Sequence, residues 1–204
     1  MAKKYAVLIT MLFILPLSLM LAGCGEYGRV DQGRAIAYDK AAKTVTIIRD
    51  KSIDPKKPDY SVLPPMKYQI PDNPAEMGPE PKPGKRMKLD TVKKQIVIFN
   101  PATNNFETIT YTPIEQKHVE SKDPLVYDVA ADKSKVFPVV DQQKKTITIY
   151  SRRLKEYVKF SVPDQYFSMP ADTWDNGDEV RIYFKQEGKS LRFMNITKTD
   201  IFKK

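Results

Sequence analysis

The sequence predicts an all-β protein built from two tandem, small, five-stranded barrel-like units. Apolar residues recur mostly at every second position, as in residues 44–48, 145–150 and 179–184, which is the pattern of a strand with one buried face. These segments are rich in Val, Ile, Thr and aromatic residues, which favour strands. Proline and glycine interrupt the chain at short intervals, and no stretch of a dozen residues carries a helical stripe.

The chain begins with a segment typical of an export signal. Two lysines precede a nearly uninterrupted apolar run over residues 5–20, and small residues follow it. This is the order of charge, apolar core and small-residue exit in a secretory signal. A transmembrane helix is the alternative, because about 20 apolar residues span a bilayer. Gly25 and Gly28 argue against it, since glycine weakens a helix.

Cys24 is the only cysteine of the chain. The tetrapeptide Leu21-Ala22-Gly23-Cys24 resembles the lipobox of bacterial lipoproteins. The resemblance implies that residues 1–23 are a lipoprotein signal peptide, that Cys24 becomes the acylated first residue, and that residues 24–32 form a lipid-anchored tether. It also implies a cell-envelope protein facing the periplasm, and Gly25 favours the outer over the inner membrane. A small buried cysteine is the alternative.

Three segments share one hairpin pattern. They are centred on Asp39, Asp90 and Asp141, which lie 51 residues apart. In each segment an apolar residue precedes the aspartate, a lysine follows four positions later, and an apolar residue follows six positions later. An aspartate carboxylate can accept backbone N–H groups within a turn. We therefore expect these aspartates to start hairpins rather than to act in catalysis.

A longer repeat matches more of the chain and indicates a duplication of a five-strand unit. The matched segments are 70–72 with 162–164, Met77 with Met169, 84–89 with 177–182, and 96–100 with 191–195. The expected units are residues 33–103 and 135–204. Closure into small barrels of the OB or SH3-like kind would hide strand edges. Residues 104–134 are then a connector that carries an added strand at 106–111.

The charge balance favours anionic partners. Removal of the two signal lysines lowers the formal net charge from +9 to +7, so we expect lipid headgroups, acidic glycans or an acidic face of another envelope protein. Nucleic acid is not expected, because no recognition-helix or RNP-like motif occurs. Two Pro-rich loops carry the basic residues expected near the membrane, with solvent exposure alone as the alternative. These residues are Lys56, Lys57, Lys82, Lys85 and Arg86.

The sequence contains no catalytic motif that would predict an enzyme. His118 is the only histidine, so neither a metal site of the common type nor a cofactor is expected. Gly-x-Ser-x-Gly, phosphate-binding glycine loops and dinucleotide fingerprints do not occur. A carboxylate pair of the glycosidase type stays open, because the 25 acidic residues allow many pairs.

The best local candidate for a ligand face is the closing hairpin of the second unit. Basic and aromatic side chains mix there, as on surfaces that bind acidic or planar ligands. The residues are Arg181, Tyr183, Lys185, Arg192 and Phe193. The alternative is a structural strand with one wet face. Trp174, just before this hairpin, is predicted to be either a lid or an exposed anchor.

Residues 24–39 and 177–200 resemble a domain-of-unknown-function lipoprotein family found in anaerobic sulfate-reducing bacteria, a resemblance that implies no activity. Together with the duplication and the missing catalytic motifs, it leads us to expect a non-enzymatic, lipid-anchored envelope protein. The tandem units would act as an interaction or assembly module at the membrane surface. A binding protein for an anionic small molecule or glycan is the alternative, followed by a carboxylate-based hydrolase.

Overall fold

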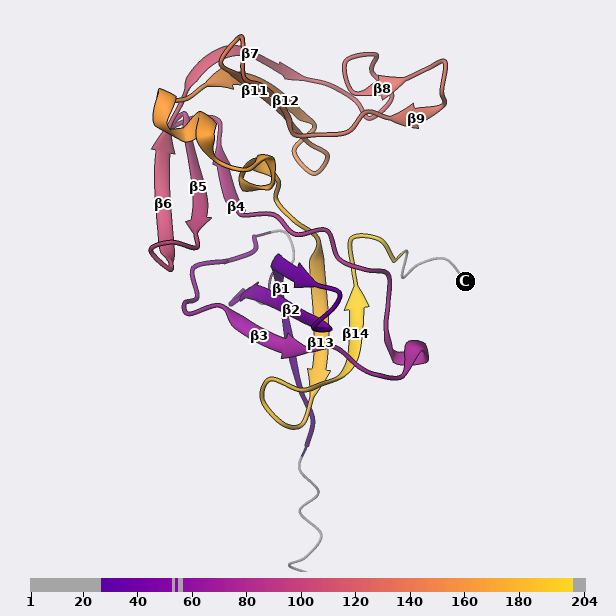
Figure 1. Cartoon of the computed structure of the whole chain (residues 1–204). Helices are drawn as coiled ribbons and strands as arrows, with labels where there is room; N and C mark the ends of the chain where they lie inside the picture. Colours follow the sequence, from indigo (N-terminus) through magenta and orange to yellow (C-terminus); the bar gives the residue numbers. More distant parts are fainter. Residues whose placement is uncertain (1–26, 53, 55–56, 200–204) are drawn as a thin grey trace, which may run out of the picture.

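The computed structural model describes residues 27–52, 54 and 57–199 (Figure 1). The predicted all-β class is confirmed, because these residues form antiparallel strands joined by turns and short 3-10 helices. Cys24, the predicted signal peptide and Lys56 lie outside the described residues. Within the described ranges, no helix has the length and hydropathy needed to cross a membrane.

Five strands form the larger sheet, in the order β14-β13-β1-β2-β3. Their bounds are β1 (Arg29–Asp39), β2 (Thr44–Arg49), β3 (Met66–Gln69), β13 (Glu179–Phe184) and β14 (Ser190–Asn195). One face of the sheet surrounds a core that includes Val45, Ile47, Tyr68, Ile182 and Phe193. The sheet curls, so that its edge strand β3 reaches the turn between β13 and β14. The backbone N–H at position 69, the end of β3, donates there to the carbonyl at 188 at 2.8 Å.

The molecule has two halves: the five-stranded sheet forms one, and the strands from β4 to β12 form the other, which we call the β4–β12 half. The β4–β12 half contains three further sheets (Figure 1). The first has β4 (Arg86–Asp90), β5 (Gln95–Asn100) and β6 (Asn105–Thr110). The second has β10 (Val139–Asp141), β11 (Thr146–Ser151), β12 (Glu156–Ser161) and β7 (Thr112–His118), in that order. The third pairs β8 (Tyr127–Asp128) with β9 (Lys133–Ser134). Isoleucines of β5, β6 and β11 share one core with Phe160 and the fully buried Trp174.

The same order of elements occurs twice along the chain. Three strands, a 3-10 helical segment and two strands follow one another in each repeat. From β1 to β5 the helical segment is η2 (Pro74–Glu76), and from β10 to β14 it consists of η3 (Asp164–Ser168) and η4 (Ala171–Trp174). The final pairs are exchanged: β13 and β14 complete the sheet of β1–β3, whereas β5 packs in the core of β11 and β12.

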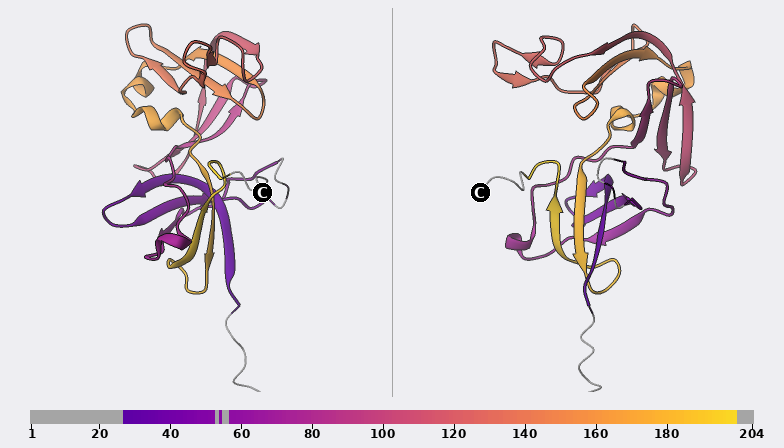
Figure 2. Two further views of the ribbon diagram at one scale, coloured as in Figure 1. Left: turned by 90° about the vertical axis from the view of Figure 1, so that its right-hand side faces the viewer. Right: turned by 180° about the vertical axis from the view of Figure 1, so that it is seen from behind.

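The two tandem five-stranded units are therefore not confirmed, and no closed barrel occurs among the described residues. The physical reason lies in the two connections. The segment after η2 and the segment after helix η4 (Ala171–Trp174) both run between the two halves instead of turning back (Figure 2). Each repeat consequently completes the half that the other repeat begins.

The three predicted hairpin turns are confirmed in detail. The carboxylates of Asp39, Asp90 and Asp141 accept the backbone N–H of the residue three positions later, at 2.8, 2.9 and 2.8 Å. The lysine four positions after each aspartate has a positive φ, of 49°, 55° and 51°. The repeated Asp and Lys thus mark the two ends of one turn conformation.

Candidate functional site

The structure brings together most of the predicted ligand face. Arg181 and Tyr183 lie on the exposed face of β13, and Tyr183 is directly opposite Arg192 of β14. Lys185 follows the end of β13 and is exposed. Phe193 is different, because its side chain is 1% exposed and belongs to the core on the inner face.

Both arginines of this face are bound to neighbouring side chains. The Arg181 guanidinium donates to Gln32 Oε1 from Nε at 3.1 Å and from Nη2 at 2.8 Å. Gln32 in turn donates to Glu179. Arg192 Nη2 donates to the Glu76 carboxylate at 3.2 Å, and this arginine lowers the pKa of Glu76 through their hydrogen bond. The arginines therefore tie β13 to β1, and β14 to η2.

Tyr183 packs on the backbone that enters β1. A Cβ atom built on Gly28 would lie 2.1 Å from the Tyr183 ring, far inside van der Waals contact. The lack of a Cβ atom at position 28 thus allows the Tyr183 ring to lie this close to the backbone. The predicted ligand face thus includes an aromatic contact to the segment that follows Cys24 in the sequence.

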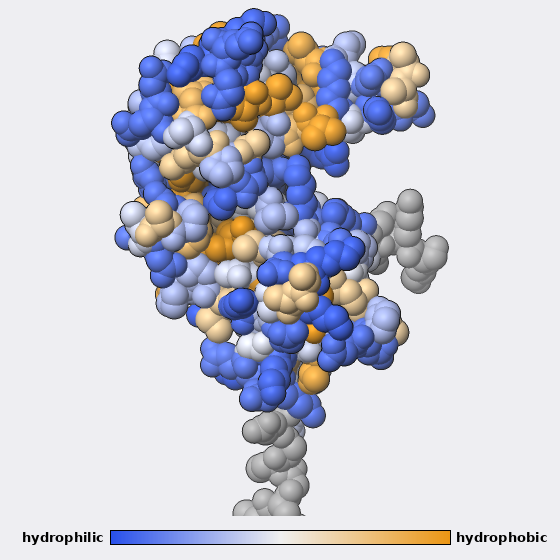
Figure 3. All heavy atoms as spheres, in the orientation of Figure 1, coloured by the Kyte–Doolittle hydropathy of each residue, from blue (hydrophilic) through white to orange (hydrophobic). Residues whose placement is uncertain are grey.

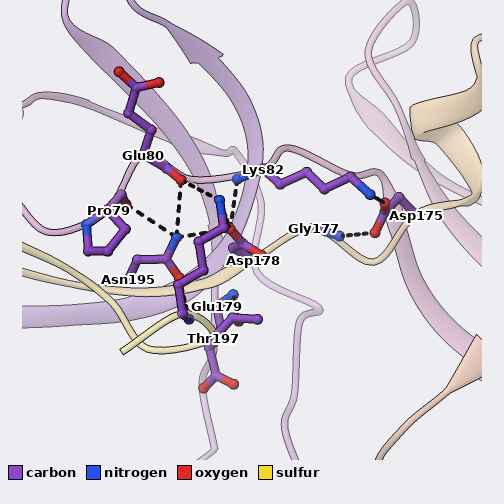
Figure 4. Close-up of polar contacts among 10 residues, drawn as sticks. Pro79, Glu80, Lys82, Asp175, Gly177, Asp178, Glu179, Asn195 and Thr197 are labelled. Atoms are coloured by element: carbon purple, nitrogen blue, oxygen red, sulfur yellow. Dashed lines mark hydrogen bonds and ion pairs between the residues drawn. The ribbon is translucent and has the colours of Figure 1, made fainter. Parts of the chain in front are cut away.

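We call the place where residues 77–85 lie against residues 175–178, between the two halves, the crossing. Three of the predicted membrane-proximal cations lie there, and Figure 4 shows one of them, Lys82. Lys82 pairs with Asp175, and Lys85 Nζ lies 2.6 Å from Asp172. Arg86 is 8% exposed, and its Nε donates to the Trp174 carbonyl at 2.9 Å.

Each of these three residues bonds to the segment that precedes β13, and their position near the membrane stays a prediction. Their Pro-rich loop is the crossing segment itself, which sequence alone could not indicate. Of the other two predicted cations, Lys57 is exposed and Lys56 lies outside the described residues.

Asp178 and Asn195 form the buried centre of this crossing (Figure 4). Their exposures are 6% and 0%. Asp178 Oδ2 accepts from the Lys82 backbone N–H at 2.8 Å and from Asn195 Nδ2 at 2.9 Å, and it lies 3.4 Å from Lys198 Nζ. Neither residue was singled out from the sequence, although the repeat aligned Asn195 with Asn100 and so marked the position.

Arg86 is a buried cation at neutral pH. Burial is the main cause that lowers its pKa, to about 10, and the nearby positive charge of Arg34 acts in the same direction. Asp175 opposes this shift. Because the carboxylates of the crossing are bonded to cations and backbone N–H groups, the arrangement fits a structural role.

A cleft of about 480 Å³ lies on the other side of β1. It exists because β1 pairs with β13 from Arg29 onward, whereas its pairing with β2 begins only at Gly33. The lining includes Asp31, Arg49 and Lys51, with Val62 and Leu63 as apolar wall. This cleft could not be predicted from the sequence, because it depends on how far two strands overlap.

The polar groups of the cleft centre on Asp31. The buried Tyr68 hydroxyl donates to the Asp31 carboxylate, and Arg49 Nη1 lies 3.9 Å from the same carboxylate. Burial, then the hydrogen bond to Asp31, raises the pKa of Tyr68, so its hydroxyl stays protonated at neutral pH. Arg49 and Lys51 share the lining with the carboxylates of Asp31 and Asp50, so the cleft contains both signs of charge. Its two cations are the groups that would pair with an anionic ligand.

The described residues include no cluster of three His, Cys, Asp or Glu side chains that could hold a metal ion. His118, on the exposed strand β7, has its Nδ1 3.6 Å from Glu156 Oε1. Trp174 is 0% exposed in the core of the β4–β12 half. Of the two alternatives for Trp174, its position excludes the exposed anchor.

Comparison with curated proteins and with solved structures finds no match. Residues 26–204 match a protein family described as a domain of unknown function, DUF4881. The match covers both halves and the crossing between them. The chain therefore belongs to the DUF4881 family.

Proposed function

We propose that the chain is a non-enzymatic, lipid-anchored cell-envelope protein facing the periplasm, in which the two β halves form an interaction or assembly module at the membrane surface. The observation that carries this proposal is the position of Cys24 relative to β1. Arg29, the first residue of β1, follows Cys24 by five positions. An acyl anchor on Cys24 would hold β1 within about 18 Å of the membrane surface, because an extended residue spans at most about 3.6 Å.

The position of β1 within the sheet would attach the anchored segment firmly to the rest of the fold. β1 is the central strand of the five-stranded sheet, with β13 on one side and β2 on the other. The crossing adds ion pairs and buried hydrogen bonds between segments far apart in sequence, such as Lys85 with Asp172 and Asp178 with Asn195. Many charged groups are thus used to fix the shape of the molecule, which suits a module that presents a surface.

A membrane-fractionation experiment tests the anchor. We expect Cys24→Ser to accumulate as an uncleaved or mislocalised precursor, because the substitution removes the sulfur that would be acylated. Val92→Ser, at an exposed position in the turn between β4 and β5, is the control, since it keeps both the cysteine and the segment that follows it. Identical processing and fractionation of the wild type and Cys24→Ser would contradict the proposal.

The cleft favours a second candidate function, the binding of an anionic small molecule or an acidic glycan. Arg49 and Lys51 line its wall, and neither takes part in the crossing. Inorganic phosphate and D-glucuronate are suitable probes. At millimolar concentration they should raise the Tm of the wild type and of Lys133→Gln, an exposed control, but not that of Arg49→Gln. Equal shifts in all three proteins would contradict this candidate.

A further inference from the structure

One end of the five-stranded sheet gathers four exposed cations around the start of β1. Arg29 pairs with Phe184, the last residue of β13, so the turn between β13 and β14 begins beside the first residue of β1 (Figures 1 and 2). This turn carries Lys185 and Lys189. Lys67 joins them, because its carbonyl oxygen lies beside Gly188. We call Arg29, Lys67, Lys185 and Lys189 the basic end.

The charge of the basic end is not neutralised within the part of the chain that the structure describes. All four side chains are exposed, and none forms an ion pair with a described carboxylate. The Arg29 guanidinium lies 5.0 Å from the centre of the Phe184 ring, which holds it at this end. Glu187 is the one acidic residue in the turn between β13 and β14. Figure 3 shows mostly hydrophilic side chains on this part of the surface.

Apolar side chains accompany these cations. Tyr27 is 94% exposed and Val30 is 56% exposed. Tyr183, on the neighbouring strand, is 36% exposed. Tyrosine favours the headgroup level of a bilayer, and basic side chains are attracted to its anionic lipids. The same end therefore offers both kinds of contact that a peripheral membrane surface needs.

We propose that the basic end docks on anionic lipid headgroups and so orients the protein on the membrane. This inference rests on the proposed lipid anchor. The basic end begins five residues after Cys24, whereas the opposite end of β1 is another 11-residue strand away, about 36 Å at 3.3 Å per residue. The partner is a membrane surface rich in phosphatidylglycerol or another anionic phospholipid. Charge complementarity selects it over a neutral surface.

Vesicle binding tests this docking without the acyl chains. The mature chain with Cys24→Ser should bind phosphatidylglycerol-containing vesicles at low salt, release them as salt rises, and ignore pure phosphatidylcholine vesicles. Lys185→Glu with Lys189→Glu should weaken binding at least tenfold, since each basic residue near the surface contributes to the attraction. Arg152→Glu with Arg153→Glu, an equal charge change in the β11–β12 turn, should leave binding within about twofold, because these residues lie in the other half.

The outcomes distinguish lipid phosphate from free phosphate as the ligand, and they distinguish docking of the basic end from acylation of Cys24. Added inorganic phosphate at constant ionic strength should not displace the protein from vesicles; displacement would mean a discrete phosphate site and would overturn the docking. An equal loss of vesicle binding in the Lys185/Lys189 and Arg152/Arg153 double variants would also overturn the docking. So would the absence of binding by the unsubstituted basic end in a Cys24→Ser chain that shows native thermal unfolding. Lys185→Gln with Lys189→Gln repeats the test without introducing negative charge. Acylation of Cys24 is measured separately, so failure of the docking leaves the anchor proposal unaffected.

Discussion

Asp178 is a buried carboxylate that bonds to several segments at the crossing between the two halves. Its buried carboxylate accepts hydrogen bonds from the Lys82 backbone and from Asn195, and it lies close to the Lys198 ammonium. These partners come from the crossing segment, from β14 and from the chain after β14. The Asp178 side chain therefore joins its own segment, before β13, to residue 82 and to residues 195–198.

Replacement of Asp178 by alanine should lower the free energy of unfolding by about 2–4 kcal/mol, because buried donors would lose a charged acceptor. Urea denaturation gives this difference. The exposed Asp72, which pairs with Lys43, offers a matched control, and Asp72→Ala should change stability by less than about 1 kcal/mol. Equal effects of the two substitutions would show that Asp178 has no special structural role.

At the residue scale, the sequence predicts which residues lie on strands. It does not predict which residues of neighbouring strands lie together on one face of the sheet. Arg192 and Phe193 are neighbours on β14, and successive strand residues point to opposite faces. Phe193 is accordingly in the core while Arg192 is exposed. The pairing of Tyr183 with Arg192 depends on strand register, which the alternation of apolar residues leaves open.

At the element scale, two of the turn aspartates, Asp90 and Asp141, make the stability of the folded protein fall at acidic pH. Backbone hydrogen bonds from Lys93 and from Lys144 are the largest cause that lowers the pKa of Asp90 and of Asp141, respectively. The charged form is thus favoured in the folded state. Stability from these carboxylates is present above their ordinary pKa and is lost as the pH falls through the lowered folded-state pKa.

Asp90→Asn combined with Asp141→Asn should therefore flatten the loss of stability at acidic pH. Asparagine retains an acceptor for the turn but has no carboxyl group to titrate. Thermal unfolding between pH 6 and pH 2 measures the slope. Asp72→Asn, at an exposed position outside the turns, should retain the wild-type slope. An unchanged slope in the double variant would mean that other carboxylates dominate acid unfolding.

Gly84 is where the two connecting segments come closest. A Cβ atom on Gly84 would lie 2.2 Å from the Gly177 backbone nitrogen and 2.5 Å from the Asp175 carbonyl oxygen. Gly84→Ala should cost about 3 kcal/mol or more, because backbone atoms cannot move aside as a flexible side chain can. Gly188→Ala, which meets only ordinary contact at φ 77°, should cost about 1–2 kcal/mol from backbone strain. Urea unfolding should show the larger loss for Gly84→Ala; the reverse order would contradict a tight crossing.

The period-two patterns predicted strands that the structure contains, such as β2, β11 and β13. They could not predict the exchange of strands. Residues 84–89 and 177–182 have matching patterns, so each could complete either half as far as apolar alternation is concerned. Non-local contacts of Gly84 and Asp178 fix the choice, and such contacts carry no local sequence signal.

At the scale of the whole molecule, the exchange makes the second repeat incomplete by itself. Residues 135–204 contain β13 and β14 but lack β1, which pairs with β13, and they lack β5, which fills the core against β11. An isolated fragment of residues 135–204 should therefore give a poorly dispersed amide NMR spectrum. Residues 79–176, which contain β4–β12, should unfold cooperatively. A dispersed spectrum for 135–204 would instead indicate an independent unit.

We propose that the β1 end is held at a membrane through an acylated Cys24. Mass spectrometry of the mature protein, purified from its native membrane, tests this anchor. We expect the N-terminal residue to be Cys24 carrying a diacylglyceryl thioether, with residues 1–23 removed. A mature N-terminus with an unmodified cysteine, or a protein that retains residues 1–23, would contradict the account.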